Sequence, residues 1–265
     1  MKKIFIFASV AITAISLNRP SADAAALSLD GVDDWVDITN GVGVIPSGNA
    51  PFTIGAWVNP DVHGDGTMTF WGNQAGNEAN GFRLMSGGNV RHYFWGNDND
   101  QSTGDISSDT SGPNGDGWHH LSVTFDGTID NWYWNGAPLG TPFNTGGTVN
   151  VADANHRIGS RLDAEFFDGL IDEISIWGVA LDEASIASGW NQPIDLGAPG
   201  VDQALIAYYN FENGLADSAP LGGSQDGVAN GGASIDQGAN APIPEPSAAI
   251  LGALATALLL LRRRR

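Results

Sequence analysis

The stretch DGLIDEISIW, residues 168–177, alternates apolar and polar side chains in the manner of a β-strand. Leu170, Asp172, Ile174 and Ile176 share one parity, and successive side chains of a strand point to opposite faces, so the stretch predicts a strand with one apolar face. A bare carboxylate on that face is costly, so we expect Asp172 to have a partner. Two partners remain open: a calcium ion, or a hydroxyl or histidine of a neighbouring strand that donates a hydrogen bond.

The same alternation recurs on either side of this stretch. Residues 52–58, 121–125 and 207–211 each place apolar side chains at every second position, and clusters of Gly, Asn and Asp separate them. Many short strands joined by tight turns are typical of an antiparallel sandwich or jelly roll. A helical pattern is confined to residues 181–188, which Gly189 follows. The sequence therefore predicts an all-β fold of two packed antiparallel sheets.

Composition excludes several classes of chemistry. The chain has 265 residues, 42% of them hydrophobic, and contains no cysteine. This hydrophobic share favours a globular chain over a disordered one. Without cysteine, neither disulfides, nor a thiolate metal site, nor a cysteine nucleophile can form.

The charge is strongly acidic once the two ends are set aside. Residues 26–243 hold no lysine and four arginines against 28 acidic residues, a formal charge near −24, whereas the whole chain carries −19. Such a surface repels phosphate backbones and anionic lipid, so nucleic acid is not expected as a partner. Divalent cations and neutral molecules are favoured instead.

The first 25 residues are typical of a secretory signal peptide. Lys2 and Lys3 precede an apolar run over residues 4–17, and small residues at Ala22, Ala24 and Ala26 have the spacing that a signal peptidase recognises. We expect residues 1–25 to be removed and the protein to be exported. An N-terminal anchor is the alternative.

The last residues, 241–265, have three parts in order. Pro244, Glu245 and Pro246 precede the apolar run 248–261, and four arginines end the chain. A helix over 248–261 would span roughly 21 Å, short of the roughly 30 Å hydrocarbon core, so it is a weak permanent anchor. The order resembles the PEP-CTERM sorting signal of Gram-negative bacteria. That resemblance implies transient membrane insertion, processing by an exosortase-type enzyme, and a cell-surface or extracellular-matrix setting among exopolysaccharide producers. A simple tail anchor is the alternative.

Five motifs between these ends resemble the LamG-like family of laminin G and concanavalin A-like domains, over residues 26–190. The resemblance implies a jelly-roll β-sandwich, which we extend to residues 26–240. The segment 203–236 looks like a stretch that often precedes such domains, so it either adds permuted closing strands or is the remnant of a second repeat. The motifs are ALSLDGVDDWV (26–36), FTIGAWV (52–58), GWHHLSVTFDG (117–127), RIGSR (157–161) and DGLIDEISIW (168–177).

The resemblance also bears on metal binding. Similar jelly rolls bind calcium where the first and last strands meet. It therefore implies calcium as a cofactor, with Asp30 from the opening strand and Asp172 as its ligands. The loop 97–100 does not match an EF-hand, because Thr103 stands where the sharp turn needs Gly.

Tryptophans beside Gly and Asn are the candidates for sugar binding. Sugar C–H faces stack on aromatic rings, while Asn and Asp hydrogen-bond to hydroxyls. Trp71 with Asn73, and Trp95 with Asn97 and Asp98, are the candidate glycan-binding residues. The alternative for both tryptophans is a place in the core, which is the favoured place for Trp132 and Trp134.

No catalytic set stands out. Some relatives of this fold are glycoside hydrolases that carry Glu-x-Asp-x-x-Glu on one strand, and no Glu of this chain starts that spacing. His119 and His120 are adjacent in a predicted strand, so we expect one buried and one exposed. We therefore expect a non-catalytic binding or adhesion module for neutral glycan or exopolysaccharide. The alternatives are a structural matrix protein that binds other proteins, and a polysaccharide hydrolase or lyase.

Overall fold

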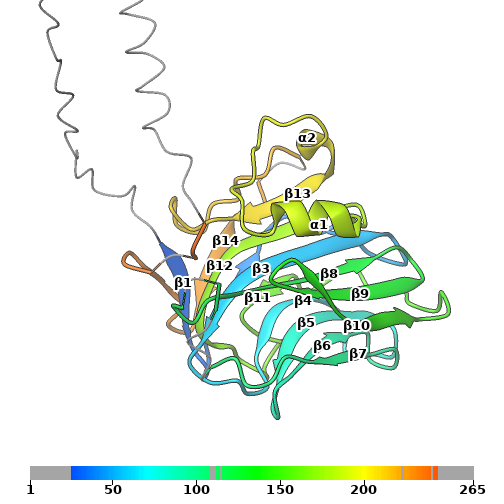
Figure 1. Cartoon of the computed structure of the whole chain (residues 1–265), viewed down its shortest axis with the longest axis horizontal. Coiled ribbons are helices and arrows are strands. Elements are labelled where there is room, and N and C mark those ends of the chain that lie inside the picture. The colour runs from blue at the N-terminus through cyan, green and yellow to red at the C-terminus, as the bar shows by residue number, and fades with distance from the viewer. Residues whose placement is uncertain (1–24, 108–111, 114, 222–223, 240, 244–265) are drawn as a thin grey trace, which may run out of the picture.

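The computed structural model describes residues 25–107, 112–113, 115–221, 224–239 and 241–243 as two antiparallel sheets packed face to face (Figure 1). The all-β jelly-roll prediction is confirmed. The eight-stranded sheet runs β10 (Ala137–Asn144), β9 (Ile129–Trp134), β8 (His119–Phe125), β3 (Phe52–Pro60), β12 (Asp168–Trp177), β1 (Ala26–Asp30) and β15 (Ser234–Asp236), with β13 (Leu205–Tyr209) also on β12. The seven-stranded sheet runs β14 (Gly227–Asn230), β2 (Trp35–Ile38), β11 (Arg157–Ile158), β4 (Thr67–Gly72), β5 (Ala79–Met85), β6 (Asn89–Tyr93) and β7 (Asn99–Ser102).

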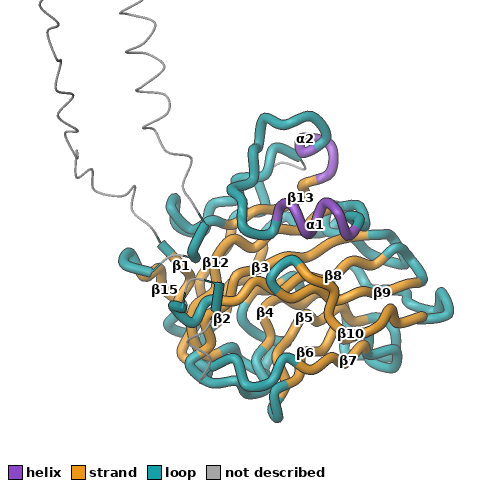
Figure 2. The backbone as a smooth tube through the Cα atoms, viewed as in Figure 1, coloured by secondary structure: helices purple, strands orange, loops and turns teal. Residues whose placement is uncertain are grey.

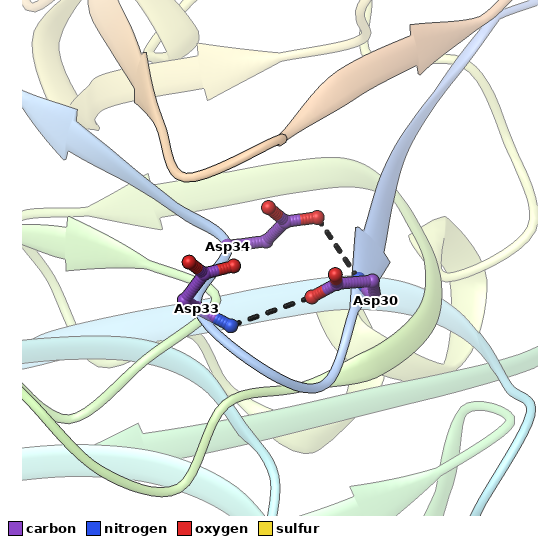
Figure 3. Close-up of side chains that lie close together, drawn as sticks. All are labelled: Asp30, Asp33 and Asp34. Carbon is purple, nitrogen blue, oxygen red and sulfur yellow. Dashed lines mark hydrogen bonds between the residues drawn. The ribbon is translucent and has the colours of Figure 1, made fainter.

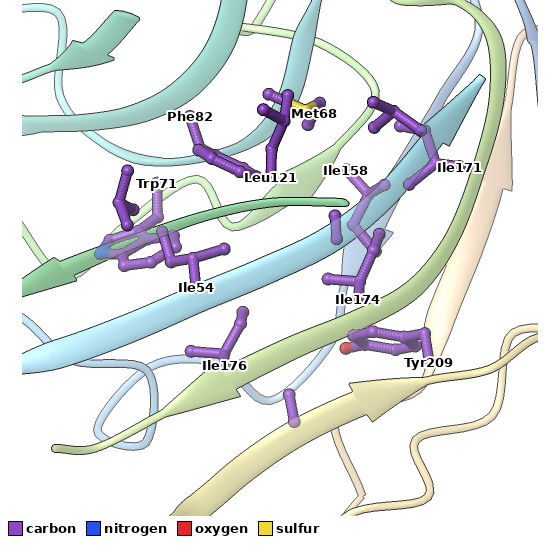
Figure 4. Close-up of a cluster of buried hydrophobic side chains, with 14 of the residues drawn as sticks. Ile54, Met68, Trp71, Phe82, Leu121, Ile158, Ile171, Ile174, Ile176 and Tyr209 are labelled. Carbon is purple, nitrogen blue, oxygen red and sulfur yellow. The ribbon is translucent and has the colours of Figure 1, made fainter. Parts of the chain in front are cut away.

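Alternation along the strands builds the core between the sheets. Ile54 of β3 and Leu121 of β8 point inward from the eight-stranded sheet, and Trp71 and Phe82 point inward from the other (Figure 4). All four side chains are fully buried. Phe82 stacks on Trp132 at 5.1 Å between ring centroids, so Trp132 takes its expected place in the core.

A β-bulge in β12 reverses the parity on which the placement of Asp172 rested. The register with β3 shifts between Asp172 and Ser175, and Glu173 has a φ of 53°. Ile171 therefore faces the core before the bulge, while Ile174 and Ile176 face it afterwards. The prediction that Asp172 shares the core face with Ile174 was wrong, because an extra residue was inserted between them.

Two short helices lie on the outside of the eight-stranded sheet (Figures 1 and 2). α1 (Glu183–Gly189) begins after Asp182, whose carboxylate accepts a hydrogen bond of 2.8 Å from the Ser185 N–H. This cap explains a start two residues later than the helical pattern indicates. α2 (Val201–Ala204) leads directly into β13.

The late segment 203–236 adds strands to both sheets. β13 pairs with β12, β15 pairs with β1, and β14 pairs with β2 of the seven-stranded sheet. The segment thus closes the edge of the same sandwich. No helix in the described part of the chain is long and apolar enough to cross a membrane. The expected signal peptide, apart from its last residue, the helix 248–261 and the tripeptide Pro244, Glu245 and Pro246 lie outside the described residues.

Candidate binding surface

The outer face of the seven-stranded sheet carries the four arginines of residues 26–243. Strand register places Asp37, Arg157, Phe70, Gly81 and Tyr93 in one row, because residues paired across strands point to the same face. A second row contains Arg83, Arg91 and Asp100. We call this surface the arginine–aromatic face.

Trp95 is the exposed ring of this face. It follows β6 and has a φ of 57°, and 36% of its surface is exposed. Its ring centroid lies 5.5 Å from that of Tyr93, which is buried. The Arg161 Cζ atom lies 5.4 Å from the Trp95 centroid and 5.9 Å from that of Tyr93. The three side chains thus form a contiguous platform, which we call the Trp95 platform, with one ring open to solvent.

Glu165 fixes Arg161 of the platform and the neighbouring Arg83. Its Oε2 atom lies 2.6 Å from Nη1 of Arg83 and 2.9 Å from Nε of Arg161. Arg83 is itself buried and lies over Tyr93. Planar guanidinium groups held by a carboxylate lose little freedom when they bind a further partner. Burial raises the pKa of the Tyr93 hydroxyl, so the ring stays neutral at physiological pH.

A similar contact stands at the other end of the face. The Arg157 Cζ atom lies 4.9 Å from the Trp35 ring centroid, and its Nε atom lies 3.1 Å from Oδ1 of Asp37. Arg157 also donates to the carbonyl of Leu162 at 2.7 Å. The face therefore carries two arginine–tryptophan contacts.

The structure separates the two tryptophans that the sequence treats alike. Trp71 is fully buried, and its indole N–H donates to the carbonyl of Pro46 at 2.8 Å. Its prediction as a sugar-stacking residue was wrong, because its parity on β4 points it into the core. Asn73, beside it, donates to the Glu78 carboxylate at 3.0 Å.

Asn97 and Asp98 shape the loop below Trp95. The Asn97 amide donates to Oδ1 of Asn77 at 2.7 Å and to Oγ1 of Thr148 at 2.9 Å. The Asp98 carboxylate accepts from the Phe94 N–H at 3.1 Å and lies 3.6 Å from Arg91. Both side chains hold the turn that carries Trp95, so their role here is to position that ring.

Asp30 and Asp172 do not share a metal site. Asp30 pairs with Asp168, which places Asp172 four register positions away, about 13 Å along the strand. Asp172 is buried, and its Oδ2 atom accepts from the Ala241 N–H at 2.8 Å. Burial and the Glu173 carboxylate raise the pKa of Asp172 well above its usual range. The predicted calcium pair was therefore wrong, and the partners of Asp172 are backbone N–H groups.

An acidic cluster does lie beside Asp30. Ligand oxygens of Asp30, Asp33 and Asp34 lie within 4.8 Å of one another (Figure 3). Asp34 is buried and accepts from the N–H groups of Asp30 and Gly232. Asp30 and Asp33 are exposed and keep carboxylate oxygens at the surface, so the donor chemistry suits a hard cation such as calcium.

Asp168 adds a further carboxyl to this edge. Burial raises its pKa, and the neighbouring carboxylates of Asp61 and Asp30 raise it further. Mutual repulsion of this kind is relieved when a cation binds.

The paired histidines are both buried, contrary to the expectation of one exposed ring. Nδ1 of His119 lies 3.3 Å from the indole nitrogen of Trp134. His120 lies on the outside of the sheet, where Trp57 and Trp190 cover it, with ring centroids 5.6 and 6.3 Å away. The expectation was wrong because the segment after α1 covers this face.

Sequence reasoning missed Tyr93, Arg161 and Glu165 as parts of the surface. Their contacts join β6 to the loop after β11. These segments are far apart in the sequence, so no pattern of neighbouring residues could predict that they meet. One signal was present: in a body with four arginines, Arg157 and Arg161 lie within a single motif.

Comparison with known proteins agrees with this architecture. Residues 30–187 match the family model of the concanavalin A-like lectin/glucanases superfamily, Laminin_G_3. The chain belongs to this family. As a Laminin_G_3 protein it is similar to adhesion G-protein coupled receptor V1 of Danio rerio, with 27% identity over 157 residues. That match covers 57% of this chain and spans 2% of the receptor's length.

Two solved structures share the fold. A candidate carbohydrate-binding protein from Bacteroides ovatus ATCC 8483 matches with a TM-score of 0.58 and 17% identity, over 83% of this chain and 61% of that one. The heptameric SAP-like pentraxin of Limulus polyphemus matches with a TM-score of 0.56 and 14% identity, over 86% of this chain and all of that one. At these identities the likeness shows the concanavalin A-like fold.

Proposed function

We propose that this Laminin_G_3 protein is a non-catalytic glycan-binding module that acts outside the cell. The observation that carries the proposal is the platform of Trp95, Tyr93 and Arg161, an exposed indole backed by a fixed guanidinium. Sugar C–H groups stack on such a ring, and guanidinium and carboxylate groups beside it hydrogen-bond to hydroxyls. The name of the Bacteroides protein supports the same ligand class.

The ligand proposed is a neutral glycan, such as an exopolysaccharide. The folded body is strongly acidic, and the arginines beside Trp95 already face carboxylates, so an anionic polymer gains little from them. The Glu165 carboxylate beside the platform is held by Arg83 and Arg161. This arrangement supports binding without hydrolysis or elimination.

Calcium enters the proposal in a revised form. Asp30 and Asp33, with Asp168 nearby, are the carboxylates that would hold the ion at the edge of β1. An ion there would stiffen the rim and neutralise part of its charge. No step of glycan binding at Trp95 depends on it.

Export, sorting and setting complete the proposal. The basic and apolar N-terminal segment supports export, and the Pro244–Pro246 tripeptide with its apolar and basic sequel supports exosortase-type processing. We place the protein on the surface or in the matrix of a Gram-negative bacterium. A protein-binding matrix role is the second candidate, which the exposed apolar side chains Val32 and Val42 favour.

The test is a glycan array with the purified chain, with and without a chelator. Saturable binding to neutral glycans that survives the chelator is expected. A flat signal across neutral glycans would contradict the proposal. Self-association of the protein without sugar would favour the matrix role. Release of reducing ends or unsaturated products would establish an enzyme instead.

A further inference from the structure

A pocket of about 550 Å³ opens on the opposite side of the molecule from the arginine–aromatic face. The outer face of the eight-stranded sheet forms its floor, and α1 with the loop leading to α2 forms its walls. A volume of this size is typical of small-molecule sites. Glycan binding at Trp95 makes no use of it.

The walls of the pocket are largely aromatic and aliphatic. Trp57 of β3 lies 5.5 Å from Trp190, with an angle of 31° between the rings. Ile186 of α1 and Ile194 complete the apolar lining on the loop side. Gly136 leaves room for Trp190, because a Cβ atom at that position would overlap the indole. The backbone is thus adapted to hold Trp190 over the sheet.

The floor of the pocket contains polar groups that have no hydrogen-bond partner among the described residues. Among them, the indole N–H of Trp57, Nδ1 of His120 and the hydroxyl of Ser122 find no hydrogen-bond partner. Each of these side chains is at least nine-tenths buried and lines the pocket. Buried polar groups normally have a partner, so three such groups beside one cavity leave hydrogen-bonding capacity that a ligand or water can satisfy.

Gly55 keeps this floor open. A Cβ atom there would lie 3.1 Å from the hydroxyl of Ser175 and 3.3 Å from Nε2 of His120. The imidazole is uncharged, because burial lowers the pKa of His120 to about 3. It therefore offers one donor and one acceptor.

No cation of the described chain lines the pocket, since its arginines all lie on the other sheet. The acids at the edge are engaged: Glu173 accepts from the Tyr208 hydroxyl, and Asp195 accepts from the Gly197 N–H at 3.0 Å. An anion would find no counter-charge here, and a cation would have to give up its hydration in a largely apolar cavity.

We propose that this cavity, the α1 pocket, binds an uncharged molecule of one or two rings with an apolar body and one hydroxyl group. The body packs against Trp190 and the apolar side chains of Ile186 and Ile194. The hydroxyl reaches the floor, where it accepts from one unpartnered group and donates to another. This site is independent of glycan binding at Trp95.

Three naphthalene derivatives of equal ring size test the proposal on the purified chain: 2-naphthol, the anion 2-naphthoate, and the cation 2-naphthylmethylammonium. Saturation-transfer NMR and tryptophan fluorescence measure their binding. We expect saturable binding of 2-naphthol. The affinity for each of the two ions should be lower by about tenfold or more. Absence of 2-naphthol binding, or tighter binding of either ion, would overturn the proposal.

Two variants locate the site. Ala198→Trp narrows the mouth from a surface loop, and His120→Phe replaces the polar imidazole with an apolar aromatic ring. Each variant should bind 2-naphthol about tenfold more weakly than the wild type. Trp95→Ala, on the other sheet, should leave it unchanged. If His120→Phe fails to fold, Ala198→Trp alone decides, and unchanged affinity in that variant contradicts the site. Because glycan array signals do not enter this test, failure of either proposal leaves the other standing.

Discussion

The guanidinium of Arg161 lies over the indole of Trp95, with Cζ 5.4 Å from the ring centroid. Glu165 holds that guanidinium through a 2.9 Å contact. The exposed ring is therefore preorganised, which reduces the conformational entropy lost when a ligand stacks on it.

Glu165→Gln should both destabilise the fold and weaken glycan binding. The substitution removes the charge that joins Arg83 to Arg161, and Arg83 is buried. We expect the free energy of unfolding to fall by about 1–3 kcal/mol in urea denaturation. Asp100→Asn is the control, because its contact with Arg91 is half-exposed and should cost less than about 1 kcal/mol. Equal losses in both variants would contradict the structural role of Glu165.

Trp71→Phe should lower stability without changing the affinity for glycan. Trp71 is buried, donates to the Pro46 carbonyl and contacts Phe52 edge-on at 5.7 Å. Loss of that hydrogen bond and of ring volume should cost about 1–3 kcal/mol, measured by urea denaturation. A selective loss of glycan binding in a folded variant would return Trp71 to the binding site.

Acid should destabilise the protein through His120. Burial lowers its folded pKa to about 3, whereas the ordinary value is 6.5. Between these values the unfolded chain binds the extra proton, so the contribution of His120 is full above pH 6.5 and is lost as pH falls. From pH 7 to 4.5 the loss is about 2–3 kcal/mol.

The measurement is urea denaturation of the wild type and of His120→Phe at both pH values. Between pH 7 and 4.5, the free energy of unfolding of His120→Phe should fall by about 2–3 kcal/mol less than that of the wild type. The comparison cancels other titrating groups, including His156, whose pKa burial also lowers. Parallel curves would mean that the folded protein accommodates a charged His120.

Calcium should raise the melting temperature through the acidic cluster at β1. The double variant Asp30→Asn with Asp33→Asn removes the exposed carboxylates and should abolish the shift. Asp172→Asn is the contrast, because Asp172 is engaged with the N–H groups of Ala241 and Glu173 and lies away from the cluster. If the single variant Asp172→Asn also loses the calcium-induced rise in melting temperature, the pair predicted from the sequence, Asp30 with Asp172, would be supported instead.

Alternation predicted the sandwich because a period of two survives in most strands, and the core of β3 and β8 follows it directly. The alternation failed at Asp172. The β-bulge at Glu173, whose backbone is left-handed, inserts an extra residue there, and a repeat of two residues cannot reveal it. The pairs Trp71-Gly72 and Trp95-Gly96 show a second limit. The same dipeptide is buried on β4 and exposed after β6, because strand parity and the positive φ of Trp95 decide the direction of the ring.

The proposed function depends most directly on the exposed ring of Trp95. The decisive measurement is the affinity of the wild type, Trp95→Phe and Trp95→Ala for the neutral glycan that gives the strongest array signal. The account predicts a loss of about tenfold or more for Trp95→Ala, partial retention for Trp95→Phe, and unchanged melting temperatures. Equal affinity in all three folded proteins would contradict it.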